Sequence, residues 1–308
     1  MRVLYMGTPD FAVKPLEALL EKGYTVCGVV TQPDKPVGRK AVLTPPPVKV
    51  VAEKNGLKVF QPNTLKNGEG IEILKETEPD VVAVVAYGKI LPKDFLEYTK
   101  YGCINIHGSI LPKYRGAAPI QQCVLDGEEY GGVTSMQMDV GLDTGDMLLC
   151  KKTKIGENET AGELFDRLAP MGAELLIETL RAAEKGELKP VKQNEAESSY
   201  ASMLNKSMCK VDWKKSAREV HNQIRGLDPW PTALTYLDGK TLKLFSSSVS
   251  AELSGGNPGE TKTLKSGLAV FCGDGKAVVL SEVQFEGKKR MKATDFLNGH
   301  PIPDGTVL

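Results

Sequence analysis

The sequence predicts an α/β fold, with a mostly parallel sheet domain in the first 189 residues and a small β-barrel domain in the last third. Two observations support this prediction. Apolar runs of strand length alternate with amphipathic segments up to about residue 185, as in a right-handed, Rossmann-like sheet. Short β-rich runs with turn residues between them then replace the alternation, which is typical of an OB-like barrel. We expect the α/β domain at 1–189, a polar linker at 190–204 and the barrel at 205–308.

The elements of the α/β domain follow from local signals. Arg2–Met6 is an apolar run that predicts the first strand. Apolar residues at helical spacing between Phe11 and Lys22 predict a helix that Gly23 ends. Val81–Ala86 is apolar on both faces, as a strand buried between two helical layers should be. Further strands are expected at Val26–Thr31, Lys58–Phe60 and Cys103–His107, and helices at Pro45–Asn55 and Gly70–Glu78.

Two capping boxes mark helices in the second half of the chain. Thr160-Ala-Gly-Glu163 starts a helix that reaches about Lys185, and Ser216-Ala-Arg-Glu219 starts a shorter one. Asp238-Gly239 and Asp274-Gly275 separate β-rich runs and are favoured at tight hairpin turns. The remaining strands are expected as a pair at Thr134–Met138 and Met147–Ile155, and in the barrel at Thr232–Leu237, Thr241–Val249, Leu268–Cys272 and Lys276–Phe285.

Composition narrows the class of protein. The 39 Lys and Arg residues balance the 39 Asp and Glu residues, but residues 201–308 hold 15 of the former and 11 of the latter, a weak indication of a polyanionic partner. No apolar run is long enough for a transmembrane helix, and the first residues do not resemble a signal peptide. The six cysteines contain no Cys-x-x-Cys pair. We therefore expect a cytoplasmic protein without a membrane partner, disulfide framework or metal site.

Common motifs for other chemistries are missing from the sequence. The first strand leads into Gly7-Thr-Pro-Asp10, which lacks the glycines of a standard dinucleotide site. There is no Gly-x-Ser-x-Gly elbow, so a serine hydrolase is unsupported. Three histidines without clustered cysteines give no metal signature.

Asn105 and His107 are the most informative pair. They lie two apart at the carboxyl end of an expected strand, so both side chains leave the same face, where open α/β sheets bind ligands. An amide and an imidazole could together stabilise an oxyanion that forms on a carbonyl carbon under attack. A lone pair of this kind is more often structural than catalytic.

The second piece is the run from Asp139 to Asp146, in which three carboxylates alternate with two glycines between expected strands. The run could be a turn and nothing more. If it brings an aspartate beside His107, that carboxylate would orient the imidazole and favour its donor form.

In these residues the chain resembles the methionyl-tRNA formyltransferases, within the wider group that transfers or hydrolyses the formyl group of 10-formyltetrahydrofolate. The resemblance implies a catalytic set of Asn105, His107 and Asp143. The family's Ser-Leu-Leu-Pro-x-x-x-Gly loop matches Ser109–Gly116, with Ile110 in place of a leucine. The segments that indicate the tRNA-directed branch are Gly7–Phe11, Thr31–Arg39, Gln137–Met147 and Ile224–Pro231.

The resemblance also implies partners and their contacts. The co-substrate would be 10-formyltetrahydrofolate, with no metal, and the acceptor would be the methionine α-amine of charged initiator tRNA. The residues assigned to folate binding are Ser109, Ile110, Leu111, Pro112, Tyr87, Gly88, Lys89, Ile90 and Leu91. Those assigned to tRNA binding are Lys35, Arg39 and Lys40, in a long loop before Pro45, and Lys206, Lys210 and Arg218 in a basic barrel domain. We expect a monomer.

Trp213 and Trp230 could stack on bases, although core packing is the safer expectation for Trp230 because it lies between prolines. His221 and His300 are expected to be structural.

Three alternatives remain open on the sequence. One is a formyltransferase that acts on a sugar nucleotide or a purine precursor. Another is a formyl-folate hydrolase, which would release formate without an acceptor. The third is an RNA-binding protein with an inactive α/β domain, against which the complete set of Asn105, His107 and Asp143 argues, because binding alone does not need it.

Overall fold

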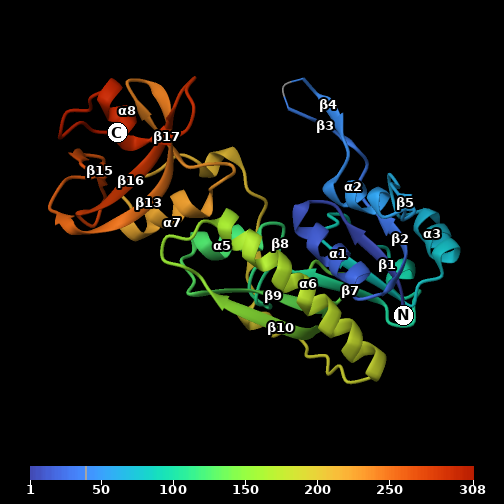
Figure 1. Ribbon diagram of the computed structural model, residues 1–308. Coiled ribbons are helices and arrows are strands. Elements are labelled where there is room, and N and C mark those ends of the chain that lie inside the picture. The colour runs from blue at the N-terminus through green and yellow to red at the C-terminus, as the bar shows by residue number, and fades with distance from the viewer. Residues whose placement is uncertain (39) are drawn as a thin grey trace. The chain divides into compact units, whose positions relative to one another are not determined.

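The computed structural model describes residues 1–38 and 40–308 (Figure 1). Two compact units make up the protein, each built from segments that are discontinuous in sequence. Unit 1 comprises Met1–Pro119, Gly131–Thr153 and Phe165–Ala201, and unit 2 comprises Ile120–Tyr130, Lys154–Leu164 and Ser202–Leu308. The domain boundaries at 189 and 205 stay a prediction.

A mostly parallel sheet of seven described strands forms the centre of unit 1, in the order β10-β9-β7-β6-β1-β2-β5. The five from β7 to β5 are parallel, and β9 pairs antiparallel with β7. The order reverses between β1 and β6, which is where doubly wound sheets open a ligand crevice at the carboxyl ends of their strands. The strands are β1 Arg2–Gly7, β2 Thr25–Val30, β5 Val59–Phe60, β6 Val81–Val85, β7 Cys103–His107, β9 Tyr130–Gln137 and β10 Met147–Lys154.

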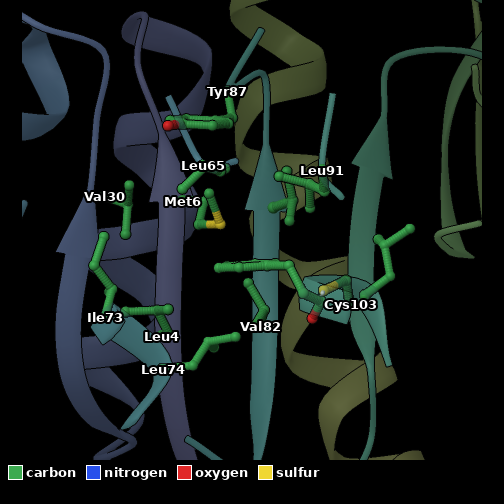
Figure 2. Packing of buried hydrophobic residues seen from close by; sticks show 13 residues of the cluster. Leu4, Met6, Val30, Leu65, Ile73, Leu74, Val82, Tyr87, Leu91 and Cys103 are labelled. Atoms are coloured by element: carbon green, nitrogen blue, oxygen red, sulfur yellow. Dashed lines mark hydrogen bonds between the residues drawn. The ribbon is translucent and has the colours of Figure 1, made fainter. Parts of the chain in front are cut away.

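Helices cover this sheet because its central strands are apolar on both faces; β6 and β7 are buried throughout. One face packs on α3 and α4, through a cluster that includes Leu4, Leu74 and Phe95 (Figure 2). On the other face, Gly172 of α6 approaches Ile106 of β7. In chain order, the helices from the first residue to the end of α6 are η1 Asp10–Ala12, α1 Val13–Glu21, α2 Pro47–Lys54, α3 Glu69–Thr77, α4 Lys93–Leu96, α5 Pro119–Leu125 and α6 Ala161–Lys185.

Two small pairings complete unit 1. β3 Lys35–Val37 and β4 Val42–Thr44 form an antiparallel hairpin where the sequence predicted a long loop. β8 Arg115–Gly116 pairs in parallel with β11 Tyr200–Ala201, and η2 Glu195–Glu197 lies just before β11. The predicted linker at 190–204 is therefore partly ordered against the α/β sheet unit, because its backbone pairs with the loop that follows β7.

An antiparallel sheet forms most of unit 2, in the order β12-β13-β16-β15-β14, with β17 paired to β16. The predicted capping box at Ser216 is present at the start of α7. The sequence missed β14, β17 and α8, which are short and carry weak patterns. The elements are η3 Lys206–Met208, α7 Ala217–Gly226, β12 Leu234–Leu237, β13 Lys240–Ser254, β14 Thr261–Leu264, β15 Gly267–Phe271, β16 Lys276–Phe285, β17 Met291–Lys292 and α8 Ala293–Gly299.

The two tryptophans of unit 2 reverse the expectation made for them. Trp213 is buried and its indole N–H donates to Thr235 Oγ1 over 3.3 Å. Trp230 is 59% exposed, even though prolines lie on both sides of it. Core packing therefore belongs to Trp213.

The described residues contain no helix long and apolar enough to cross a bilayer. Within the same residues, no three or more His, Cys, Asp or Glu side chains gather as a metal site would require. All six cysteines are free thiols.

His221 on α7 gives unit 2 a pH-dependent stability. Its ring is buried, Nε2 donates to the Glu157 carbonyl over 3.0 Å, and Nδ1 lies 2.8 Å from Ser247 Oγ. Burial lowers the pKa of His221, and the guanidinium groups of Arg225 and Arg218 lower it further. The unfolded chain therefore takes up a proton at a higher pH than the folded chain does, so this residue costs stability as the pH falls below about 6.5.

We expect the free energy of unfolding to fall with pH below about 6.5 less steeply in His221→Gln than in the wild type, by at most about 1.4 kcal/mol per pH unit. Urea denaturation between about pH 8 and about pH 5 measures the difference. His300→Gln, at an exposed position, is the control. Equal pH dependence in the wild type and His221→Gln would contradict this account.

Candidate functional site

β7 places Asn105 and His107 at the carboxyl edge of the sheet. The strand pairs with β6 on one side and β9 on the other, so its backbone is fixed in both directions. The two residues lie on the same face, and they are 8% and 6% exposed. Their side chains are therefore largely shielded from solvent at the end of the strand.

The turn between β9 and β10 supplies the carboxylate. Asp139 builds the turn, because its Oδ1 accepts from the Gly141 N–H over 3.0 Å and from Thr144 Oγ1 over 2.7 Å. Gly145 is required, since a Cβ there would lie 1.8 Å from the Gln137 carbonyl oxygen. Asp143 has a φ of 54°, a left-handed conformation that is uncommon for a residue with a side chain. Of these two aspartates, Asp143 is the one whose carboxylate faces β7.

The carboxylate of Asp143 lies between the two β7 side chains. Its Oδ1 is 3.5 Å from Asn105 Nδ2, and its Oδ2 is 3.7 Å from His107 Nδ1. The Gly116 N–H donates to Oδ2 over 2.9 Å. The structure therefore brings together Asn105, His107 and Asp143, from two segments far apart in the sequence.

The orientation of His107 is set by the loop after β7. Its Nε2 lies 2.8 Å from the carbonyl oxygen of Tyr114, which can only accept, so Nε2 carries a hydrogen. The other ring nitrogen, Nδ1, faces Asp143. A hydrogen bond from His107 to a substrate oxygen would thus use Nδ1, not Nε2.

Several polar groups of the loop at 109–116, which is predicted to bind folate, form hydrogen bonds that hold the loop itself. Ser109 Oγ donates to the Lys113 carbonyl over 2.6 Å. Thr134 Oγ1 donates to the Ser109 carbonyl over 2.7 Å and accepts from the Leu111 N–H over 3.2 Å. Ser109 and Leu111 are buried, whereas Ile110 and Pro112 are partly exposed. These hydrogen bonds hold the loop in shape, and its contacts with folate stay a prediction.

The loop after β6, which carries the other predicted folate residues, is anchored by side chains that point away from solvent. Tyr87 and Leu91 are buried in the cluster shared with α3 and α4 (Figure 2). Lys89 Nζ donates to the carbonyls of Pro62 and Asn63 over 2.9 and 2.8 Å. Ile90 is 77% exposed. The face that a ligand could meet is therefore mostly backbone, together with the side chain of Ile90 and the exposed Gly88.

Two of the predicted tRNA residues of unit 1, Lys35 and Lys40, lie on or beside the paired strands β3 and β4. Lys35 Nζ donates to Gln32 Oε1 over 2.7 Å, and Lys40 is exposed. Arg39 lies outside the described residues. The exposed apolar side chains of Val37 and Leu43 share the hairpin with these cations.

The predicted tRNA residues of unit 2 are all exposed. Lys210 Nζ lies 5.8 Å from the centre of the Tyr236 ring, a cation–π distance. Arg218 forms an ion pair with Glu157 over 3.0 Å, so part of its charge is already matched within unit 2.

The sequence did not point to three groups that touch the site. They are the Gly116 N–H, the Tyr114 carbonyl and the stretch at 193–200, whose Gln193 and Ser199 contact the two loops. Backbone groups leave no residue-type signal. The stretch is polar and irregular, and Tyr200 is its only residue of a type enriched in strands.

Comparison with known protein families finds one match in each half of the chain. Residues 1–180 match the family described as formyl transferase, and residues 203–301 match formyl transferase, C-terminal domain.

Among similar sequences are proteins named methionyl-tRNA formyltransferase. The one from Lachnospira eligens is 49% identical over 314 residues, which cover 100% of this chain and 99% of that protein. The one from Alkaliphilus metalliredigens is 50% identical over 309 residues, which cover 100% of this chain and 98% of that protein.

Solved structures with the same fold are more distant in sequence. WlaRD, a sugar 3N-formyl transferase crystallised in the presence of dTDP and 5-N-formyl-THF, has a TM-score of 0.71 at 22% identity, covering 94% of this chain and 99% of that one. HypX from Aquifex aeolicus in complex with tetrahydrofolic acid has a TM-score of 0.66 at 18% identity, covering 100% and 51%. At these identities the likeness concerns the fold.

Tyr87 gives a test of the anchored loop. Its hydroxyl is buried without a hydrogen-bond partner among the described residues, and burial raises the pKa of Tyr87 to about 12. The equally buried Tyr5 donates to the Ala12 carbonyl. We expect Tyr87→Phe to leave the free energy of unfolding unchanged or raise it by about 1–2 kcal/mol, because a buried hydroxyl without a partner is removed.

The matched variant Tyr5→Phe is expected to lower the free energy of unfolding by about 1–2 kcal/mol, because it leaves a buried carbonyl without its donor. Urea denaturation of both variants measures the contrast. A loss in Tyr87→Phe as large as that in Tyr5→Phe would mean that the Tyr87 hydroxyl is satisfied in solution.

Proposed function

The chain belongs to the formyl transferase family in both of its domains, and from this premise we propose that it transfers the formyl group of 10-formyltetrahydrofolate to the α-amine of methionine on charged initiator tRNA. The product, formylmethionyl-tRNA, serves translation initiation. The relatives that support this acceptor are about half identical along the entire chain. The structural observation that best supports this proposal is the cluster of Asn105, His107 and Asp143 at the carboxyl edge of the sheet.

The chemistry needs a neutral amine and a place for negative charge. An α-amine titrates near ~8, so a useful fraction is neutral around physiological pH. As the amine attacks the formyl carbon, the carbonyl oxygen becomes negative. Asn105 Nδ2–H and a proton on His107 Nδ1 are the donors proposed for that oxygen, each worth roughly 3 kcal/mol.

Asp143 has two roles in this proposal. It orients His107 from the Nδ1 side, opposite the Tyr114 carbonyl that holds Nε2. It also accepts the proton of the attacking amine, directly or through a water. When the tetrahedral intermediate collapses, the bond between the formyl carbon and folate N10 breaks, and this proton passes to N10 as tetrahydrofolate leaves. The Gly116 N–H keeps the carboxylate aimed at β7 while it does so. Neither role requires a covalent enzyme intermediate.

The folate is proposed to lie along the two loops that leave β6 and β7. These groups fit a flat, polar heterocycle joined to an aromatic ring. The backbone around Gly88 would contact the edge of the heterocycle, and Ile90 and Ile110 would make apolar contacts. The side chains of Tyr87, Lys89 and Leu91 are engaged within the protein, so their proposed contribution is through the backbone. Ser109, Leu111 and Pro112 shape the second wall.

The tRNA is proposed to contact cations on both units. Lys35, Arg39 and Lys40 belong to the segment that resembles the family's tRNA-directed loop, and Lys206, Lys210 and Arg218 belong to the basic last third. Such groups give affinity for phosphates without sequence choice. A cytoplasmic place follows from a role in translation initiation, and the monomeric state stays a prediction.

Transfer to a sugar nucleotide is the second candidate, because the solved structures with this fold include a sugar N-formyl transferase. Offering the protein charged tRNA and an amino-sugar nucleotide side by side separates the two. Release of formate without either acceptor would instead indicate a hydrolase.

Asp143→Asn is the test of the mechanism. We expect formyl transfer to charged initiator methionyl-tRNA to fall by roughly 10²–10⁴-fold, because an amide neither accepts the amine proton nor stabilises a charged imidazole. Transfer of label from 10-formyltetrahydrofolate measures the loss, and circular dichroism checks folding. Asp166→Asn makes the same chemical change on the exposed face of α6 and is expected to retain activity. Full activity in Asp143→Asn would retain the function and exclude this mechanism.

Arg39→Leu tests the loop segment that is predicted to contact the tRNA. Removing one charge-assisted contact to the tRNA should lower the rate at limiting tRNA roughly tenfold and leave the KM for folate unchanged. Arg181→Leu, at an exposed position on α6, is the control. An unchanged rate at limiting tRNA would show that Arg39 does not contact the acceptor.

A further inference from the structure

The stretch that follows α6 returns to β10, the outermost strand of the sheet, before the chain enters unit 2. Val191 pairs with Met147 through two backbone hydrogen bonds of 2.8 Å, directly after the turn that carries Asp143. Further along, Ser199 accepts from the Tyr114 N–H over 2.9 Å through Oγ and from the Arg115 N–H over 2.9 Å through its carbonyl. The stretch at 191–201 therefore lies against both loops that surround the candidate catalytic carboxylate.

Gln193 contacts both loops with one side chain. Its Nε2 donates to the carbonyl of Asp143 and to the carbonyl of Gly145, each over 2.8 Å. Its Oε1 accepts from Arg115 Nε over 2.9 Å. Both amide hydrogens and the amide oxygen are therefore used. The contacts are with the Asp143 turn itself and with Arg115, which lies between Tyr114 and Gly116, the residues whose backbone groups contact His107 and Asp143.

Arg115 connects Gln193 to a further residue of the same stretch, Glu195. Arg115 is 7% exposed, and its guanidinium forms a bidentate ion pair with Glu195, with N···O distances of 2.9 and 2.8 Å. The guanidinium also holds the pKa of Glu195 below its ordinary value. The backbone is equally close, since a Cβ on Gly116 would lie 2.7 Å from the Ala201 carbonyl oxygen. Gly116 is the residue whose N–H holds the Asp143 carboxylate.

We propose that Gln193 is a positioning residue for formyl transfer: its amide fixes the Asp143 turn and links it to the loop that orients His107. The proposal rests on the proposed function. Asp143 has a left-handed backbone, which a residue with a side chain adopts only when its surroundings hold it there. The two carbonyls that Gln193 binds belong to the first and last residues of the Asp143–Gly145 segment. These hydrogen bonds fix the backbone of the segment, and with it the direction of the carboxylate.

Glutamine is the residue that this arrangement needs. A glutamate would keep the acceptor for Arg115 but would turn a carboxylate oxygen toward two carbonyl oxygens, without a hydrogen to donate. An alanine would remove all three contacts. The two variants therefore separate a role that acts through the Asp143 turn from one that acts only through Arg115.

The experiment compares Gln193→Ala and Gln193→Glu with Lys192→Gln, a substitution at the exposed neighbouring residue. Single-turnover and steady-state formyl transfer to charged initiator methionyl-tRNA are measured for each variant. We expect kcat to fall about 10–100-fold in both Gln193 variants, with KM for both substrates changed less than about threefold. Gln193→Glu keeping wild-type kcat would overturn the proposal, since it keeps the Arg115 contact alone.

A double-mutant cycle with Asp143→Asn tests whether Gln193 acts through Asp143. Adding Gln193→Ala to Asp143→Asn should lower the single-turnover rate less than about twofold, because the carboxylate it positions is already gone. A full 10–100-fold loss in that background would mean that Gln193 acts elsewhere and would overturn the proposal.

Amide hydrogen exchange provides a measurement that does not depend on activity. Residues 139–146 should exchange faster in both Gln193 variants than in the wild type or Lys192→Gln. Unit 1 outside this turn and the segments at 114–116 and 191–201 should be unchanged. Unchanged exchange in this turn would overturn the proposal. A wild-type protein that transfers no formyl group to tRNA would contradict the proposed function alone, since the exchange measurement still decides whether Gln193 holds the turn.

Discussion

The carboxylate of Asp143 depends on the hydrogen bond from the Gly116 N–H, and the arrangement of the site depends on that carboxylate. The side chain is only 12% exposed, so a charge there must be matched by donors. The Gly116 N–H supplies one at 2.9 Å, and Asn105 and His107 face the remaining directions. A displaced side chain would leave Asn105 and His107 without the group that both of them face.

The sheet makes this meeting point possible. β7 is hydrogen-bonded on both sides, so the Cα positions of Asn105 and His107 are fixed by the ladder and not by their side chains. β9 runs antiparallel to β7 and ends with Gln137 beside Ile104, and the turn that follows reaches back along β7 so that Asp143 faces Asn105 and His107. The rigid part of the site is thus a strand, and the part that needs support is the turn with Asp143.

Sequence patterns were sufficient for the parts of this molecule that depend on periodicity and local capping. Cys103–His107 and Lys276–Phe285 match β7 and β16 at both ends, and the capping box at Ser216 is present. Sequence patterns predict a loop where β3 and β4 pair, because each of these strands has three residues and no buried face. Asn105, His107 and Asp143 could be named from a resemblance, but their distances depend on a long-range pairing that no local pattern encodes.

The orientation of His107 shows why the remaining part of the site lies beyond sequence patterns. An Asn-x-His motif fixes which face the ring leaves, but not which nitrogen points to which partner. That choice is made by the carbonyl of Tyr114, a backbone group in a loop whose own shape depends on Ser109, Thr134 and Ser199. Since the carbonyl occupies Nε2, only Nδ1 can face both Asp143 and a substrate oxygen. The loop after β7 therefore does more than line a folate pocket, because its backbone determines which proton His107 can offer to the reaction.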